Sequence, residues 1–149
     1  MTTATPGAVS FPSRISTLQL TRVRAVAGAT AAALVVNLAI WLLGLAAGGD
    51  FMVSDGDNGR ISAAPVGVIV MTVIPMVVGL TAAALLSLRW PAILRVAQVI
   101  GAILPIVTIA MTVTSDFDGQ SMVALSIMHI VVAAAVVLGL QAIRNRINA

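Results

Sequence analysis

The sequence predicts an all-α integral membrane protein built as a four-helix transmembrane bundle. Of its 149 residues, 60% are apolar and only 9% are charged, whereas soluble domains carry about 25% charged residues. Four long apolar runs, separated by short polar segments, account for most of the chain. A soluble domain of this length could not cover so much apolar surface with so few charges, so we expect the bilayer to surround most of it.

The four apolar runs set the predicted boundaries, because each is long enough to cross a hydrocarbon core of about 30 Å as a helix. A cleaved signal peptide is the alternative for the first run, but the apolar core of a signal peptide, about 7–15 residues, is shorter than this run. The predicted parts are residues 1–24 for a cytoplasmic N-terminal tail, 25–143 for the transmembrane domain with spans at 25–47, 63–88, 93–114 and 121–143, and 144–149 for a cytoplasmic C-terminal tail.

Two prolines interrupt the central spans. Pro75 lies near the middle of the second apolar run, and Pro105 lies within the third. Because proline has no N–H and its ring clashes with the preceding turn, we expect helices 2 and 3 to be kinked at these positions. The same residues are candidate hinges, although static kinks that shape packing are commoner.

Small and polar residues follow one face of each span, which is the composition expected where helices meet in lipid. In the second span this face is predicted to run through Val68, Thr72, Pro75, Gly79 and Ala83. We expect these faces to point into the bundle.

The segment of residues 48–62 is the longest polar connection between spans. Its Asp55-Gly56 and Asn58-Gly59 dipeptides are typical of tight turns and lie between short apolar stretches. This pattern predicts a short β-hairpin that caps the outer face of the bundle.

The charges divide between the two sides of a four-span chain. All the aspartates fall on one side with Arg60, and the other arginines fall on the side of the two termini. The positive-inside rule therefore places both termini in the cytoplasm of a multi-pass protein of the bacterial inner (cytoplasmic) membrane. Because these arginines are spread over short segments and form no patch, we expect no nucleic-acid partner. They are Arg14, Arg22, Arg24, Arg89, Arg95, Arg144 and Arg146.

The chain lacks the residues that most catalytic and cofactor chemistry requires. It has no cysteine and one histidine, whereas zinc needs three or four ligands and a six-coordinate b-type haem usually two axial histidines. It contains no Ser/His/Asp set, no phosphate-binding glycine loop and no paired carboxylates within the spans. We therefore expect no cofactor and no metal, and the sequence favours a non-enzymatic role while leaving that question open.

His129, the only histidine, is the leading candidate for a functional residue. At 1.5 Å per residue, it lies about 12 Å below the outer end of its span, with Asn37 at about 15 Å and Thr72 at about 14 Å. Thr108 lies at a shallower depth on the third span, and Trp41 shares a helical face with Asn37. We expect these five residues to form a polar layer in the outer half of the bundle, where they are candidate ligand-binding residues.

A structural interpretation stands beside the functional one. An ionisable residue within a membrane is a functional candidate by default, but His129 is equally explained as a neutral imidazole bonded to Asn37, Thr72 or a carbonyl freed by a proline. An asparagine within a span more commonly joins helices through hydrogen bonds than binds a ligand. Both interpretations stay open.

Several residues resemble a known family. The segment Leu125-Ser126-Ile127-Met128-His129 is similar to the last-helix signature of a family of small, uncharacterised four-span membrane proteins from high-GC bacteria, which carries a domain-of-unknown-function label. Asn37, Pro75 and the segment 101–105 resemble other parts of that family's pattern, over about residues 22–143. The resemblance implies a four-span fold and marks His129, but it implies no activity.

Three hypotheses about function follow. The absence of a catalytic set and the small-residue faces favour a non-enzymatic accessory or scaffold subunit of a larger membrane complex. The alternative is a binder or carrier of a lipophilic small molecule in a pocket around His129. A weaker alternative is an oligomeric transporter or enzyme that duplicates the His129 site. The expected partners are the lipid bilayer and either other membrane protein subunits or further copies of this chain.

Overall fold

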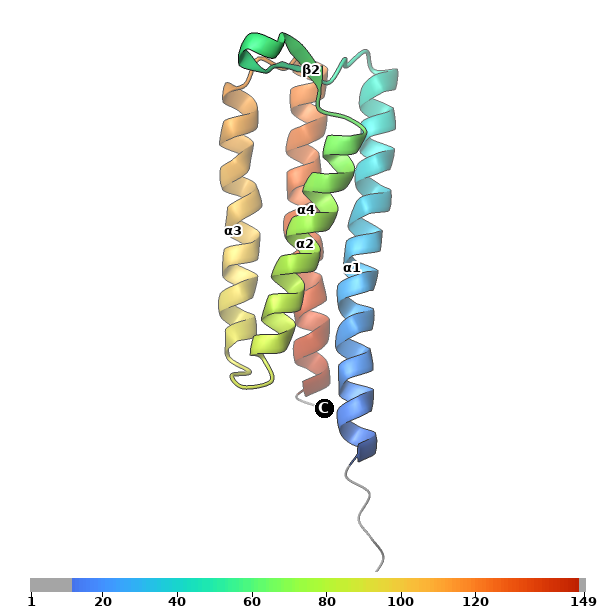
Figure 1. Ribbon diagram of the computed structural model, residues 1–149, viewed down its shortest axis with the longest axis vertical. Coiled ribbons are helices and arrows are strands. Elements are labelled where there is room, and N and C mark those ends of the chain that lie inside the picture. The colour runs from blue at the N-terminus through green and yellow to red at the C-terminus, as the bar shows by residue number, and fades with distance from the viewer. Residues whose placement is uncertain (1–11, 148–149) are drawn as a thin grey trace, which may run out of the picture.

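Four helices form an antiparallel bundle with a small β-hairpin at one end (Figure 1). The computed structural model describes residues 12–147. The helices are α1 (Pro12–Ala46), α2 (Val66–Leu86), α3 (Ile93–Thr114) and α4 (Gly119–Ile147), and the hairpin consists of β1 (Met52–Ser54), the 3₁₀ turn η1 (Gly56–Asn58) and β2 (Arg60–Ser62). All four helices are long and apolar enough to cross a membrane. The predicted all-α four-span fold is confirmed.

The outward faces of the helices are apolar. Val35 on α1, Val78 on α2, Met111 on α3 and Leu138 on α4 are each 63–69% exposed. A water-soluble protein rarely exposes so continuous an apolar surface, whereas in a bilayer these side chains contact lipid tails and the helices satisfy their own backbone hydrogen bonds. The chain is a multi-pass membrane protein.

The first helix extends beyond the predicted first span. α1 begins at Pro12, where proline is tolerated because the first turn of a helix has no partner for its N–H groups. The helix then runs without a break into the apolar segment, so the described part of the predicted N-terminal tail is helical. Residues 1–11 and 148–149 of the predicted tails lie outside the described residues.

Both prolines lie within continuous helices, Pro75 in α2 and Pro105 in α3. Since proline has no N–H, the carbonyl four residues earlier loses its helical donor. These carbonyls belong to Met71 in α2 and Gly101 in α3. The bend expected at each proline stays a prediction.

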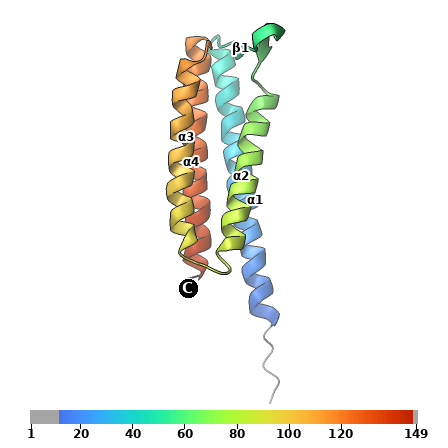
Figure 2. The same cartoon turned by 60° about the vertical axis from the view of Figure 1, so that its left-hand side comes forward.

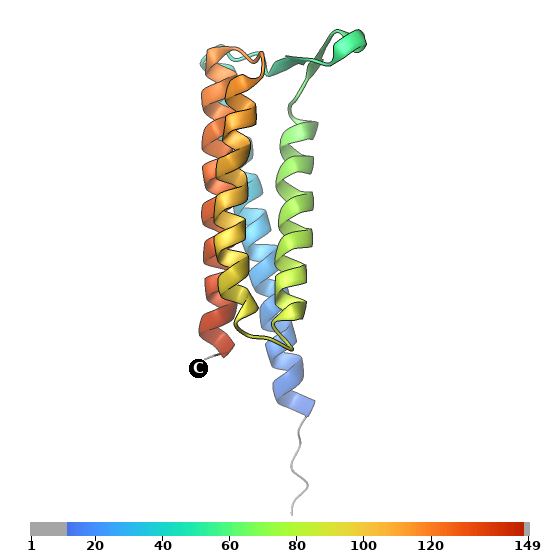
Figure 3. The same cartoon turned by 90° about the vertical axis from the view of Figure 1, so that its left-hand side faces the viewer.

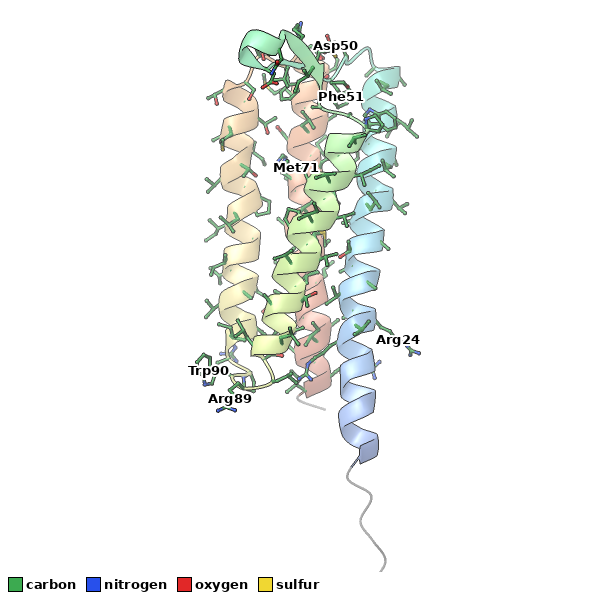
Figure 4. All side chains as sticks on the ribbon, viewed as in Figure 1. Arg24, Asp50, Phe51, Met71, Arg89 and Trp90 are labelled. Atoms are coloured by element: carbon green, nitrogen blue, oxygen red, sulfur yellow. The ribbon has the colours of Figure 1, made fainter. Side chains whose placement is uncertain are left out.

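The two ends of the bundle differ in charge. Asp50 lies beside the hairpin, and Arg24, Arg89 and Trp90 lie toward the opposite end (Figure 4). We call these the hairpin end and the arginine end. The C-terminal end of α4 and the start of α1 both lie at the arginine end (Figure 1).

The β-hairpin predicted from its turn dipeptides is present. β1 and β2 pair antiparallel, with Val53 opposite Ile61. Gly56 and Gly59 have positive φ angles of 49° and 76°, which glycine adopts without steric cost. The turn closes with a hydrogen bond of 2.8 Å from the Asp55 N–H to the Gly59 carbonyl.

Phe51 anchors the base of the hairpin in the bundle. Its side chain is 1% exposed, and its φ of 53° lies in the left-handed region that bulky residues rarely adopt. The ring fills the space over Gly44 of α1, where a Cβ would lie 2.6 Å from the Phe51 Cζ. The Phe51 N–H donates to the Ser121 Oγ of α4 at 2.8 Å. Burial of the ring and this hydrogen bond offset the backbone strain.

The closest helix contacts involve α4. At Gly139 a Cβ would lie 2.9 Å from the Cβ of Ala29 on α1, and at Gly101 of α3 it would lie 2.4 Å from the Val136 Cγ1 of α4. Small residues at such points let helix backbones approach closely, which drives helix association in lipid. α4 is thus packed between α1 and α3, as the rotated view in Figure 2 also shows.

α2 packs on the other helices at the arginine end and diverges from α3 toward the hairpin end. Its buried side chains Met76 and Leu80 join a core with Ala33 of α1 and Leu140 of α4. Figures 1 and 3 show α2 and α3 close together where residues 87–92 connect them and farther apart near the hairpin. This divergence places the cavity described below.

Candidate functional site

A cavity of about 570 Å³ lies within the bundle beneath the β-hairpin. Its volume falls within the range of small-molecule pockets, about 300–1,000 Å³. All four helices and the hairpin contribute to a wall that contains no Asp, Glu, Lys or Arg. The lining residues are Asn37 of α1; Val53, Ile61, Ser62 and Ala63 of the hairpin region; Gly67, Val68, Met71, Thr72 and Pro75 of α2; Leu104, Pro105, Thr108 and Thr112 of α3; Phe117; and Leu125, Met128, His129 and Val132 of α4.

The cavity brings together four of the five residues proposed from the sequence as ligand contacts. Asn37, Thr72, Thr108 and His129 lie in its wall, one from each helix. Their convergence follows from similar depths on four parallel or antiparallel helices. The result is a small set of polar groups in an otherwise apolar wall, the usual composition of a ligand pocket.

Trp41 does not line the cavity. It lies one helical turn nearer the hairpin end than Asn37 and packs, partly buried, against the cluster of Phe51, Val68 and Met128. The sequence placed Trp41 on the correct face of α1. It gave no sign that the Phe51 ring enters the bundle at that depth.

Asn37 and Thr72 form the one side-chain hydrogen bond between α1 and α2 in the described residues. The Asn37 Nδ2 donates to the Thr72 Oγ1 at 2.9 Å, and both side chains are buried, at 1% and 3% exposure. The Asn37 Oδ1 is also buried but has no hydrogen-bond partner. A buried amide oxygen without a donor is destabilising, by about 1–3 kcal/mol.

His129 bonds within its own helix. Its Nδ1 lies 2.7 Å from the Leu125 carbonyl oxygen, and because a carbonyl only accepts, the Nδ1 carries the proton when the ring is neutral. The Nε2 of that tautomer is a hydrogen-bond acceptor. No hydrogen bond to it is found in residues 12–147.

The hydroxyl donors around the cavity bond to nearby carbonyls. Thr108 donates to the Pro105 carbonyl at 2.7 Å, and Thr112 donates to the Thr108 carbonyl at 3.3 Å. Ser62 donates to the Ala64 carbonyl at 2.6 Å. These bonds leave the hydroxyl groups with accepting capacity but no free hydrogen.

The cavity opens between α2 and α3 toward the lipid. Met71 of α2 and Leu104 of α3 line it and are nevertheless 72% and 58% exposed. Figure 4 shows Met71 on the hairpin half of α2. A molecule dissolved in the bilayer would therefore reach the cavity without crossing an aqueous phase.

The hairpin forms the outer wall of the cavity, which the sequence did not predict. Val53 and Ile61 are opposite each other in the ladder and both line the cavity. Directly opposed residues project to the same face of a hairpin. The signal was present in the apolar residues flanking the turn, but only the tertiary fold determines which face of the hairpin meets the bundle.

Two aspartates hold the hairpin on the helices. Asp116 accepts hydrogen bonds from the Ser54 Oγ and, at 3.0 Å, from the Ser54 N–H. Asp118 accepts from the Ser121 Oγ and from the Asp50 N–H at 3.1 Å. The pKa of Asp116 is lowered, chiefly by the Ser54 hydroxyl, and that of Asp118 is strongly lowered, chiefly by the Ser121 hydroxyl.

Within residues 12–147, no group of three or more His, Cys, Asp or Glu side chains is placed to hold a metal ion. The chemistry available in the cavity is hydrogen bonding by Asn37, Thr72 and His129 together with apolar contact. That is chemistry suited to binding.

Comparison with known proteins gives a family but no characterised relative. No curated protein and no solved structure matches this chain. The model of a family described as "Family of unknown function (DUF6069)" matches residues 17–146. This match contains all four spans, the cavity and the residues whose pattern suggested such a family. The chain belongs to the DUF6069 family.

Proposed function

We propose that this protein binds or carries a lipophilic small molecule in the cavity beneath the hairpin. The observation that supports this most strongly is an apolar cavity of about 570 Å³ whose wall includes four polar residues, one from each helix: Asn37, Thr72, Thr108 and His129. A mostly apolar wall with a few polar groups is the usual composition of a small-molecule site. The opening beside Met71 and Leu104 supports entry from the bilayer.

A cavity-filling substitution tests this function. Thr108 lines the cavity, and its hydroxyl bonds only within α3. Thr108→Phe places a ring in the cavity, whereas Val107→Phe, the matched control, adds a ring at a neighbouring position that is 58% exposed to lipid. The full-length proteins are extracted with their native lipids, and the bound small molecules are quantified by mass spectrometry.

We expect the wild type and Val107→Phe to retain one lipophilic compound in near-stoichiometric amount. Thr108→Phe should lose most of it. Identical small-molecule content in the wild type and Thr108→Phe would overturn the proposed function.

A second proposal is the accessory-subunit role. A hollow of about 480 Å³ lies between α1 and α4 and is lined largely by small residues, among them Gly28, Ala32 and Ala135. Such a surface suits close approach by a helix of another subunit. The same extraction tests it, because a subunit should co-purify in fixed ratio with both the wild type and Thr108→Phe. A protein that purifies alone would contradict this role.

We also propose that the hairpin end faces the outside of the cell and the arginine end the cytoplasm. The support is the distribution of arginines, which favours the cytoplasmic side. In this orientation the cavity opens into the outer leaflet of the cytoplasmic membrane.

A further inference from the structure

We infer that the hollow between α1 and α4 binds one molecule of an anionic phospholipid, with an acyl chain in the hollow and the phosphate group at Arg24. The hollow shares no lining residue with the cavity beneath the hairpin, so this site does not depend on the binding of a lipophile there. It lies on the same surface as the one proposed for a subunit helix, and the two occupants exclude each other.

The wall of the hollow is apolar and faces the lipid. Its volume is about 480 Å³, and Arg24 is the single polar or charged residue of its described lining. Every other lining residue is glycine, alanine, valine or leucine. Val36 and Leu138 line the hollow and are 44% and 68% exposed. A hydrocarbon chain of the surrounding bilayer therefore has direct access to this wall.

The hollow exists because α1 and α4 cross on small residues. At Gly139 a Cβ would lie 2.9 Å from the Ala29 Cβ, whereas at Gly28 a Cβ would meet no atom within 4 Å. The first value shows that the two helices are in close contact at the floor of the hollow. The second shows that the space over Gly28 is not filled by other parts of the protein.

The length of the hollow matches the depth of one leaflet. Its lining runs from Arg24 to Val36 on α1 and from Ala142 to Val131 on α4, which at 1.5 Å per residue is roughly 17–18 Å along each helix. Half of a hydrocarbon core of about 30 Å is about 15 Å. The hollow thus begins at the arginine end and ends near the middle of the bilayer, as one acyl chain does.

Arg24 has no acidic partner at its end of the bundle. All five acidic residues lie within residues 50–57 and 116–118, at the hairpin end, and the one ion pair among residues 12–147 joins Arg60 to Asp50 there. Arg24 is exposed on the arginine half of α1 (Figure 4). A guanidinium group donates paired hydrogen bonds to a phosphate group, and basic sites between helices at this level attract anionic lipids.

The position of the charge favours a lipid over a helix. A helix of another subunit would continue past Val36 to the far side of the membrane, and it would need no cation at one end of its contact. A phospholipid has an apolar chain about one leaflet long and a phosphate group at the end of it. The hollow and Arg24 complement these two parts in the same order.

Two lipids with the same acyl chains test the headgroup. Phosphatidylglycerol is anionic, and phosphatidylcholine has no net charge. The purified full-length protein is placed in nanodiscs that contain equal amounts of both, and the lipids that stay bound to it are counted by native mass spectrometry. We expect one bound lipid, with phosphatidylglycerol preferred about fivefold.

A pair of glycine variants assigns the lipid to the hollow. Gly28→Leu places a side chain in the hollow, whereas Gly79→Leu adds the same side chain at an exposed position of α2 that lines neither the hollow nor the cavity. At both positions a Cβ would meet no atom within 4 Å, so neither variant should disturb the bundle. Gly28→Leu should lose most of the bound lipid, and Gly79→Leu should keep it.

A pair of arginine variants assigns the headgroup. Arg24→Gln should reduce the preference for phosphatidylglycerol to less than about twofold. Arg89→Gln removes an exposed arginine from the same end of the bundle but outside the hollow, and it should keep the wild-type preference. An equal loss in both variants would show a general attraction to the arginine end and would overturn the role of Arg24.

Three further results would overturn the inference. They are equal retention of the two lipids by the wild type, equal lipid content in Gly28→Leu and Gly79→Leu, and a polypeptide that co-purifies from native membranes with the wild type and Gly79→Leu but not with Gly28→Leu. The last would assign the hollow to a subunit helix. Thr108→Phe fills the cavity beneath the hairpin and should keep the phospholipid, so the two sites are tested separately.

Discussion

Replacement of Gly101 by alanine should push α3 away from α4. A Cβ at this position would lie 2.4 Å from the Val136 Cγ1, whereas carbon atoms in contact are about 3.5–4.0 Å apart. The helices must therefore separate by roughly 1 Å, since the β-branched Val136 has little rotamer freedom in a helix. Overpacking of this kind destabilises a protein by about 1–3 kcal/mol.

A second glycine supplies the baseline. Gly79 of α2 is exposed, and a Cβ there would meet no atom within 4 Å. Gly79→Ala should raise the free energy of unfolding by about 0.5–1 kcal/mol through helix propensity alone. Gly101→Ala has the same propensity gain, so the difference between the two variants isolates the packing cost.

A double-mutant cycle locates the clash. Val136→Ala removes the Cγ1 that the new Cβ would meet, and the cost of Gly101→Ala should then fall by about 1 kcal/mol or more. The assay is reversible denaturation in mixed detergent micelles, with the free energy of unfolding measured for the wild type, each single variant and the double variant. If Gly101→Ala were as stable as Gly79→Ala, or if the cycle showed no coupling, the close contact between α3 and α4 would be refuted.

Two further predictions concern the hairpin and the orientation. The pKa values of Asp116 and Asp118 are lowered in the folded protein. The stability that these two carboxylates give the folded hairpin is therefore complete above about pH 4, and it is lost as the pH falls through their folded-state pKa values. After correction for the intrinsic exchange rate, the protection of the Ser54 amide should thus fall as the pH is lowered below about 4, while α4 amides stay protected. Asp116→Asn should give low protection throughout, and unchanged protection would contradict the hairpin contacts. Alkaline phosphatase should be inactive when fused to the C-terminus and active when inserted at Gly56–Asn58, and the reverse pattern would overturn the proposed orientation.

The sequence predicted the spans and the hairpin because each depends on local chemistry. A helix is the structure that satisfies every backbone group of an apolar run in lipid, and the Asp-Gly and Asn-Gly dipeptides favour a tight turn. The depth of Asn37, Thr72 and His129 followed directly from the rise of a helix. These features need no knowledge of which helices are neighbours.

The inward face of α2 was less predictable. Val68, Thr72 and Ala83 of the expected face are buried, but Pro75 and Gly79 are exposed. Met76 and Leu80 are buried in that part of the helix instead. In lipid, an apolar side chain gains no hydrophobic free energy by moving from the lipid-facing side of a helix to the inside of the bundle, so hydrophobicity does not mark the inner face. The burial of Phe51 was also missed, because it depends on the space over Gly44, a residue of a different element.

The contacts of Asn37 and His129 bear on the two interpretations that the sequence left open. An asparagine that only joins helices is explained by its Nδ2, which bonds to Thr72, and that account leaves the buried Oδ1 unexplained. His129 bonds to the Leu125 carbonyl of α4 itself and to neither Asn37 nor Thr72. This intrahelical bond adds nothing to helix association. Its effect is to fix the tautomer of the neutral ring, which leaves the Nε2 as an acceptor with no partner within residues 12–147.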